Sequence, residues 1–350
     1  MRLQDSKIYI NDLDMAIEHS IGIEKLKNKS ILITGATGTI GSYIADMILR
    51  YNQVHNGRIN IYLAGRNIEK LKAKYEFWND SYLDFVSYDI TSEIRFEIKK
   101  IDYIIHAAGN AHPLAFNEDP VGTIIGNVNG TYNLLEYGKM HKLKRLLYVS
   151  SGEVYGQGDF SLDEFDEEYS GYVDTLSPRS CYPASKRAAE NLCASYTKQY
   201  GMETVIVRPC HTYGPGITST DSRANVQFIR NVLKGEDIVM KSAGTQMRSY
   251  NYIGDCASAI ITVLINGESG QAYNIANPNV RITIAQLAKM IAIVAKREVV
   301  FSDPDTIDIA NRTPIVKQVL STKKIENLGW KAAFTAEIGI RHTLDILQGK

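Results

Sequence analysis

Short apolar runs alternate with longer amphipathic segments from residue 30 onward. The β-rich runs follow one another at roughly regular intervals: SILITGA (30–36), NIYLAGR (60–66), FVSYDI (85–90), DYIIHAAG (102–109), RLLYVSS (145–151) and TVIVRP (204–209). Between the first two, SYIADMILRYN has the apolar period of a helix. Near-continuous apolar strands that alternate with helices are typical of a parallel sheet covered on both faces. The pattern predicts an α/β fold with a doubly wound parallel sheet of the Rossmann type.

The strict alternation is lost after about residue 212. We expect residues 29–212 to form the Rossmann dinucleotide-binding domain, with 245–265 returning to it. Residues 213–244 and 266–350 are expected to form a smaller C-terminal α/β substrate-binding domain. Residues 1–28 precede the first strand and are partly helical, so they are interpreted as an arm that packs on the domain or contacts a second copy of the chain.

Composition and charge narrow the class of protein. Apolar residues make up 44% and charged residues 22%, which is ordinary for a soluble globular protein. Lys plus Arg equals Asp plus Glu at 39 each, so no overall charge favours nucleic acid or membrane as a partner. The histidines have no metal-ligand spacing, and the cysteines have no pairing pattern and are expected to be buried free thiols. We expect a cytoplasmic protein without a metal site.

Glycines separate the first predicted strand from the first predicted helix in ILITGATGTIGSYIADMIL. Glycine is needed where the backbone turns sharply toward a pyrophosphate, and the helix N-terminus offers free N–H groups. A glycine pattern alone is weak evidence, but its place between a strand and a helix predicts a dinucleotide site. The expected contacts in this loop are Gly35, Thr37, Gly38, Thr39, Ile40 and Gly41.

Residues at the ends of the next strands extend the predicted cofactor site. A carboxylate after the second strand would bind the adenosine ribose of NAD, whereas the guanidinium of Arg66 suits the extra phosphate of NADP. The cofactor is therefore NAD or NADP, with Arg66 favouring NADP. Asp89 and Ile90 are expected to flank the adenine, and the small residues of HAAGNAHP (106–113) leave room for a flat cofactor. The expected contacts there are Ala107, Ala108 and Gly109.

The stretch CYPASKRAAENL contains Tyr182 and Lys186, four positions apart and hence on one face of a helix. A phenol with a pKa near 10 is a poor base at neutral pH, but an ammonium and an oxidised nicotinamide would lower that value. Ser151 stands at the tip of a different predicted strand. Together these groups predict an alcohol-oxidising site in which Tyr182 takes the proton and the cofactor takes the hydride.

Several motifs together carry a family resemblance: GATGTIG, HAAGNAHP, NVNGTYNLLE, LYVSSGEVYG, YPASK, VIVRPCHTYGPG and RSYNYIGD. Over about residues 29–345 the chain resembles the extended short-chain dehydrogenase/reductase family, specifically its nucleotide-sugar epimerases, dehydratases and decarboxylases. The resemblance implies oxidation of a sugar carbon, usually C4, chemistry on the ketone, and often return of the hydride. It makes Ser151, Tyr182 and Lys186 the oxidation triad. Asn127, Pro209, Tyr182 and Lys186 join the expected cofactor contacts.

Within that family, three segments resemble the UDP-glucuronate decarboxylases: EEYSGYVDTLSPRSCY (167–182), DSRANVQFIRNVLKGE (221–236) and GTQMRSYNYIGD (244–255). The resemblance implies that Arg248 and Arg223 contact a nucleotide-sugar, and we expect this to be a UDP-sugar. Arginine suits a diphosphate because it donates bidentate hydrogen bonds. The alternative for each arginine is a surface ion pair.

Glu153 is the candidate for a second chemical step. A 4-ketone makes the C5 proton acidic, so an acid or base near C5 and C6 permits decarboxylation, elimination or epimerisation. The alternative is that the carboxylate caps the following turn. At the position of Gly152, decarboxylases of this type have serine and the 4,6-dehydratases have aspartate. The missing aspartate counts against dehydration, and the missing serine weakens the prediction of decarboxylation. Tyr182 is followed by P-A-S rather than the decarboxylase-like D-E-G.

His211 is a further departure, since the family usually has asparagine there. This histidine could donate to a phosphate, titrate near neutral pH, or be structural. The leading prediction is an enzyme most like UDP-glucuronate decarboxylase. The alternatives are a 4-epimerase or C5-type epimerase, an NADPH-dependent keto-sugar reductase, and a non-catalytic dinucleotide-binding scaffold.

The resemblance also implies a homodimer, in which the helix after NVNGTYNLLE and the helix of Tyr182 form a four-helix contact. An apolar stripe on the second helix suits that contact but equally suits packing within one chain. Its members are Ala184, Ala188, Leu192 and Tyr196.

Overall fold

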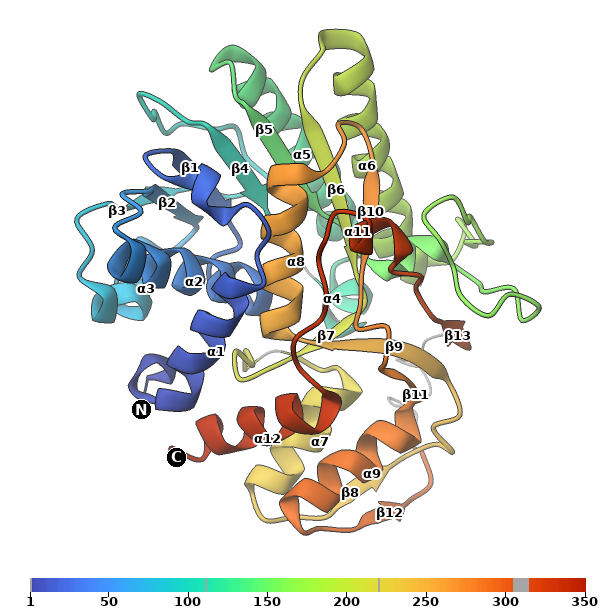
Figure 1. Ribbon diagram of the computed structural model, residues 1–350. Coiled ribbons are helices and arrows are strands. Elements are labelled where there is room, and N and C mark those ends of the chain that lie inside the picture. Colours follow the sequence, from blue (N-terminus) through green and yellow to red (C-terminus); the bar gives the residue numbers. More distant parts are fainter. Residues whose placement is uncertain (1, 110, 112, 220, 305–314) are drawn as a thin grey trace.

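The computed structural model describes residues 2–109, 111, 113–219, 221–304 and 315–350 (Figure 1). Its centre is a seven-stranded sheet in the order β10-β6-β5-β4-β1-β2-β3, in which every neighbouring pair is parallel. The strands are β1 (Ser30–Thr34), β2 (Asn60–Gly65), β3 (Leu83–Ser87), β4 (Tyr103–His106), β5 (Arg145–Val149), β6 (Thr204–Pro209) and β10 (Ala272–Ile275). Five of them fall within the predicted apolar runs, β3 begins two residues before its run, and β10 was not predicted. The predicted doubly wound α/β fold is confirmed.

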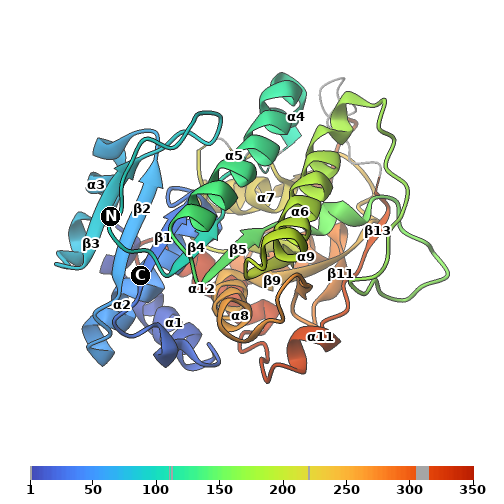
Figure 2. The same cartoon turned by 90° about the horizontal axis from the view of Figure 1, so that it is seen from above.

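Helices cover both faces of this sheet (Figure 2). On one face lie α5 (Pro120–Met140) and α6 (Cys181–Tyr200), which pack against each other. On the other lie α2 (Thr39–His55) and α8 (Ile253–Asn266), which also pack together. Because neither face meets solvent, the inner strands carry apolar residues at consecutive positions, and all five residues of β1 are buried.

A second region lies below the carboxyl ends of the central strands (Figure 1). In it β7 (His211–Tyr213), β11 (Arg281–Thr283) and β13 (Lys317–Gln318) all pair with β9 (Met247–Tyr252). A separate parallel pair is formed by β8 (Ile238–Met240) and β12 (Val299–Phe301). The helices of this region are α7 (Ala224–Leu233), α9 (Ile284–Ala295) and α12 (Ala336–Leu347).

The predicted domain boundaries differ from the structure at two elements. Within 245–265, α8 returns to the central sheet, but β9 belongs to the second sheet. Within 266–350, β10 forms the edge of the central sheet beside β6, because α8 is a crossover helix that returns the chain to that sheet. Residues 305–314 of the predicted second domain lie outside the described residues. The two-domain division itself stays a prediction.

Residues 2–28 pack on their own chain. The helix α1 (Lys7–Glu18) contacts α2, α8 and α12. Asp12 on α1 accepts hydrogen bonds from Tyr252 at 2.6 Å and from His342 at 2.8 Å. Ser6 donates to the backbone carbonyl of Lys350, so the two termini lie close together (Figure 1). The arm thereby braces α2, whose first residues border the predicted cofactor loop.

The remaining helices of the described chain are short: α3 (Ile68–Tyr75), α4 (Pro113–Glu118) and α11 (Lys323–Glu326). A membrane-spanning helix is not found among the described residues, since none of their helices is both long and apolar enough.

Candidate active site

A cavity of about 290 Å³ opens at the carboxyl ends of β1, β4, β5 and β6. The strand order reverses between β1 and β4, and ligands of open α/β sheets bind in the crevice at that point. The lining residues are Gly38, Thr39, Ile40, Gly41, Ala107, Gly109, Ala111, Val149, Ser150, Ser151, Glu153, Tyr182, Lys186, Pro209, Cys210, His211, Thr212, Thr218, Asp221, Arg223 and Gln318. All four predicted catalytic residues are thus brought together with much of the predicted cofactor loop.

The backbone of the glycine loop leaves no room for a Cβ atom at Gly35 or Gly41. Gly35 has φ +72°, and a Cβ there would lie 2.6 Å from the carbonyl of Ala107. A Cβ on Gly41 would lie 2.4 Å from the carbonyl oxygen of Gly35. Gly38 is the N-cap of α2, whose first turn leaves backbone N–H groups without helical partners. This cradle fits the pyrophosphate of a dinucleotide, which helix N-termini attract.

Three predicted cofactor residues lie near this cradle without lining the cavity: Thr37, Ala108 and Asn127. Thr37 is exposed, and the N–H of Ala108 donates to the Thr34 hydroxyl at 3.2 Å. Asn127 is buried behind Gly109, where a Cβ would lie 2.9 Å from its Oδ1, and its Nδ2 donates to Ser185.

At the adenine end, Arg66 is exposed at the end of β2 and Asp89 follows β3 on the neighbouring strand. The backbone N–H and hydroxyl of Thr91 and the charge of Arg66 lower the pKa of Asp89 against the effect of burial. Ile90 packs on α5, since a Cβ on Gly126 would lie 3.0 Å from it.

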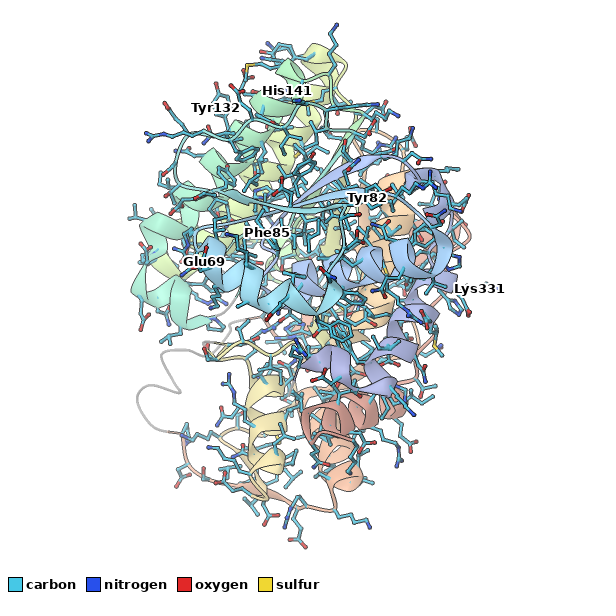
Figure 3. All side chains as sticks on the ribbon, turned by 90° about the vertical axis from the view of Figure 1, so that its left-hand side faces the viewer. Glu69, Tyr82, Phe85, Tyr132, His141 and Lys331 are labelled. Carbon is cyan, nitrogen blue, oxygen red and sulfur yellow. The ribbon has the colours of Figure 1, made fainter. Side chains whose placement is uncertain are left out.

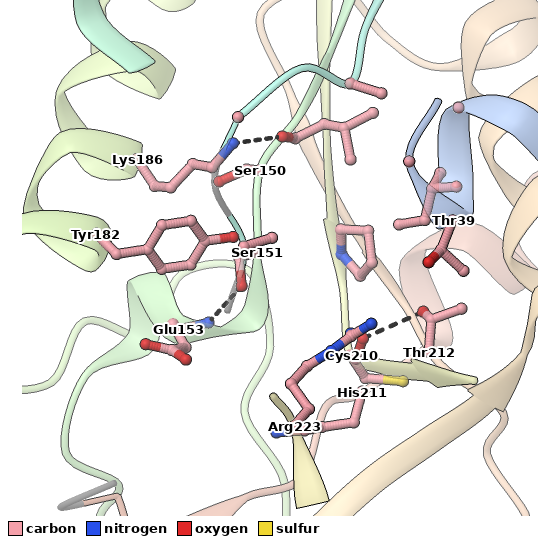
Figure 4. Close-up of a pocket in the computed structure, with 18 of the residues that line it drawn as sticks. Thr39, Ser150, Ser151, Glu153, Tyr182, Lys186, Cys210, His211, Thr212 and Arg223 are labelled. Atoms are coloured by element: carbon pink, nitrogen blue, oxygen red, sulfur yellow. Dashed lines mark hydrogen bonds between the residues drawn. The ribbon is translucent and has the colours of Figure 1, made fainter. Parts of the chain in front are cut away.

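Tyr182 and Lys186 form one wall of the cavity, with Thr39 across from them (Figure 4). The Tyr182 hydroxyl is directed toward Ser151 (Figure 4), and the side chain is 5% exposed. Lys186 is 4% exposed, and its Nζ donates to the carbonyl of Val149 at 2.9 Å. The same Nζ lies 5.7 Å from the centroid of the Tyr182 ring.

Burial controls the charge of this pair. Burial and then the charge of Glu153 raise the pKa of Tyr182 to about 12, while the Ser151 hydroxyl and the cation of Arg223 act in the opposite direction. Burial lowers the pKa of Lys186 to about 7. The phenol is therefore protonated at neutral pH until another positive charge, such as an oxidised nicotinamide, approaches it.

The turn after β5 is capped by Ser151, and not by the Glu153 carboxylate as the alternative prediction had it. The 3-10 helix Gly152–Tyr155 is capped by Ser151, whose hydroxyl accepts from the N–H of Glu153 at 3.1 Å. Turn capping is thus done by Ser151. The Glu153 carboxylate instead pairs with Arg179 at 3.3 Å.

Arg179 belongs to an aromatic stack that the motifs did not reveal. Its guanidinium lies 4.7 Å from the centroid of the Phe116 ring, and Phe116 stacks on Tyr182 at 4.4 Å. Arg179 lies within the SPRSCY stretch that carried the resemblance, so a charged residue beside the tyrosine was the available signal. Phe116 offered none.

His211 is neutral in this site. Burial and the charges of Arg248 and Arg223 lower its pKa to about 3. This lowered pKa favours a neutral imidazole over one that titrates near neutral pH. It lines the cavity together with Arg223 and the unpredicted Asp221.

The two predicted substrate arginines differ in their surroundings. Arg223 lines the cavity and also makes an ion pair with Asp221, at 2.5 Å. Arg248 is buried and donates to the backbone carbonyls of Met247 and Ile315. It is not a surface ion pair and does not line the cavity, and its contact with a nucleotide-sugar stays a prediction.

The chain matches the model of the NAD dependent epimerase/dehydratase family over residues 31–276. It is 33% identical over 309 residues to UDP-glucuronic acid decarboxylase 6 of Arabidopsis thaliana, covering 87% of this chain and 84% of that protein. It is 30% identical over 319 residues to UDP-glucuronic acid decarboxylase 1 of Xenopus tropicalis, covering 90% and 71%.

Solved structures show the same fold. A UDP-N-acetylglucosamine 4-epimerase from Methanobrevibacter ruminantium has a TM-score of 0.78 at 22% identity, covering 91% of this chain and 98% of that one. A dTDP-glucose 4,6-dehydratase from Streptomyces venezuelae, with NAD bound, has a TM-score of 0.76 at 23% identity, covering 91% and 96%.

A doubly wound sheet with a glycine cradle and a tyrosine–lysine wall defines a dinucleotide-dependent oxidoreductase-type site. The chain belongs to the NAD-dependent epimerase/dehydratase family. The resemblance inferred from its motifs, including that to the UDP-glucuronate decarboxylases, is confirmed.

Proposed function

We propose that this protein oxidises a hydroxyl of a nucleotide-linked sugar, at C4, with NAD or NADP, and that its overall reaction is most like that of a UDP-glucuronate decarboxylase. The observation that carries the proposal is the convergence of Ser151, Tyr182 and Lys186 on one cavity that the glycine cradle also borders. The decarboxylase relatives support a UDP-sugar as the substrate.

In this proposal the chain's own groups handle the proton. Ser151, fixed as the cap of its turn, holds the reacting hydroxyl beside the Tyr182 oxygen. Tyr182, once ionised, takes the hydroxyl proton as the alcohol becomes a ketone, and the bound dinucleotide supplies the hydride acceptor. Lys186 is held by the Val149 carbonyl, and its ammonium form stabilises the phenolate.

The second step is assigned to Glu153. The carboxylate lines the cavity one turn beyond Ser151, where it can exchange a proton at C5 or C6 of a 4-keto-sugar. Its partner Arg179 places a cation at the same end of the site, which favours a substrate with a C6 carboxylate. A 4-epimerase remains the second candidate, because that reaction needs only Ser151, Tyr182 and room for the sugar to turn.

The choice between NAD and NADP is proposed to depend on Arg66. Its guanidinium is exposed at the end of β2, beside Asp89. A cation there accommodates a 2′-phosphate, whereas the related dehydratase structure named above contains NAD.

A homodimer through α5 and α6 is also proposed, together with a cytoplasmic location. Exposed apolar side chains support the dimer: Val121, Tyr132 and Met140 on α5 and Tyr200 on α6. Tyr132 lies on the outer side of α5 (Figure 3). Of the predicted stripe on α6, Tyr196 is buried within the chain, while Ala188 is exposed. Sedimentation at micromolar concentration tests this, and a monomer there would contradict it.

The experiment that tests the proposed function supplies the dinucleotide-loaded protein with a panel of UDP-, dTDP-, GDP- and CDP-sugars and identifies products by mass spectrometry and proton NMR. We expect turnover of a UDP-sugar that is lost, by about a thousandfold or more, in Tyr182→Phe. Tyr200→Phe, which removes an exposed hydroxyl from the same helix, is the matched control. No turnover of any sugar would leave the scaffold alternative standing, and full activity in Tyr182→Phe would contradict the proposed role of Tyr182.

A further inference from the structure

Gly152 and Gln318 meet at the sugar end of the cavity. A Cβ added to Gly152 would lie 3.3 Å from Nε2 of Gln318 and 3.3 Å from Leu320. That spacing is tighter than an ordinary van der Waals contact, so the amide occupies the space that a side chain at position 152 would need. Gly152 stands between Ser151 and Glu153, which both line the cavity. The Gln318 amide therefore reaches the site because position 152 has no side chain.

The side-chain nitrogen of Gln318 is buried without a hydrogen bond of its own in the described part of the chain. The residue is 2% exposed, and its Nε2 has no hydrogen-bond partner in the described part of the chain. Burying an amide N–H without a partner costs free energy, so such groups in native proteins usually have a role. The carboxylate of Glu153, which lines the same cavity, pairs with Arg179 instead.

The position of Gln318 is fixed by the second sheet. It lies on β13, in register with Arg248 on β9, and it lines the cavity with Ser151 and Glu153. β13 pairs with β9, and the backbone of Phe165 hydrogen-bonds to the following residues Val319 and Ser321, which together fix the backbone that carries the side chain. Gln318 thus brings a donor to the cavity that the proposed second-step carboxylate also lines.

We propose that the side-chain amide of Gln318 donates a hydrogen bond to an acceptor oxygen on C6 of the sugar, and that Gln318 thereby selects sugars that carry such an oxygen. This inference rests on the proposed function. The oxygen is that of a C6 carboxylate or of a C6 hydroxyl, and both present lone pairs to an N–H donor. A sugar without an oxygen there leaves the amide unsatisfied and binds more weakly.

Binding by calorimetry to the dinucleotide-loaded protein tests the inference, with UDP, UDP-glucuronate, UDP-glucose and UDP-xylose as ligands. Gln318→Leu is expected to weaken both UDP-glucuronate and UDP-glucose by about tenfold, and to change UDP and UDP-xylose, which lack a C6 oxygen, by less than about twofold. Gln318→Glu separates the two sources of the oxygen, because a carboxylate there repels UDP-glucuronate more than UDP-glucose. Gln227→Leu, at an exposed position on α7, is the matched control.

A second pair of variants guards against a folding defect. Gly152→Ser alone should weaken sugar binding, because its Cβ crowds the amide. In the Gln318→Ala background the same serine gains room, and its hydroxyl should recover part of the lost affinity. Equal affinity of Gln318→Leu and the native protein for UDP-glucuronate and UDP-glucose would overturn the inference. Failure of the proposed function looks different, since the native protein itself would then bind none of these sugars.

Discussion

The guanidinium of Arg179 lies 3.3 Å from the carboxylate of Glu153, and the charges of both groups act on the phenol of Tyr182. Glu153 raises the pKa of Tyr182, and Arg179 lowers it. The ion pair therefore limits the electrostatic cost of keeping a second-step carboxylate next to the group that must ionise in the first step. Phe116 contacts both partners of this interaction, since its ring stacks on Tyr182 and lies 4.7 Å from the guanidinium of Arg179.

Replacing Arg179 with Met should raise the pKa of Tyr182 and slow turnover at neutral pH. Each pKa unit of increase lowers the ionised fraction about tenfold, so the rate–pH profile shifts to alkaline pH. Arg179→Lys keeps the charge and should shift the profile less. Glu153→Gln combined with Arg179→Met should reverse the shift in the oxidation step, because it removes the anion as well. Arg341→Met, which breaks an exposed ion pair with Glu337, is the control. An unchanged profile in Arg179→Met would contradict this account.

Replacing Arg66 with Leu tests the choice of cofactor. The variant should bind NADP about tenfold more weakly and NAD nearly unchanged, since one charge-assisted contact to a phosphate is lost. Fluorescence titration with NADH and NADPH measures both affinities. Equal losses for the two cofactors would mean that Arg66 does not contact the 2′-phosphate.

Replacing His211 with Asn should leave the shape of the rate–pH profile unchanged. The pKa of His211 is lowered to about 3 by burial and by two arginines, so the imidazole stays neutral throughout the range of activity. A profile recorded from about pH 5 to 8 covers the interval in which an ordinary histidine ionises. An acidic limb that is present in the native enzyme and absent from the variant would show instead that His211 titrates.

Asp255 should make the protein less stable as pH rises. Burial raises its pKa to about 7, against an ordinary value of 3.8. The folded state therefore favours the protonated carboxyl, and this contribution is complete below about pH 4 and is lost as pH rises to about 7. It amounts to something on the order of 4 kcal/mol in the free energy of unfolding. Asp46, with its pKa raised to about 6, acts in the same direction.

Urea unfolding across this pH range measures the effect. Asp255→Asn can still accept from the N–H groups of Ala333 and Phe334 through its amide oxygen. The variant should therefore show a flatter dependence of stability on pH than the native protein. The same slope in both would exclude Asp255 as its source.

Much of the central sheet could be predicted because β1, β4, β5 and β6 are largely buried and so appear as continuous apolar runs. β10 could not, because four residues after a buried helix carry too short a signal. Ser151, Tyr182 and Lys186 were recognisable from strand ends and helix spacing. Arg179 and Gln318 were not, since each acquires its place through contacts with distant segments. Arg248 carried a motif, but its guanidinium donates to backbone carbonyls, which no pattern of residues reveals.

The most direct test of the central claim is a single-turnover measurement with UDP-glucuronate that carries deuterium at C4. The oxidised-dinucleotide enzyme is mixed with the labelled or unlabelled sugar, and the absorbance of reduced nicotinamide is followed. The account predicts that this absorbance rises, that deuterium slows the rise several-fold because the C4–H bond breaks in that step, and that carbon dioxide is released. Product formation without any reduced nicotinamide would contradict oxidation at C4. So would a rise in absorbance whose rate is the same with and without deuterium at C4, for UDP-glucuronate and for every other UDP-sugar tested.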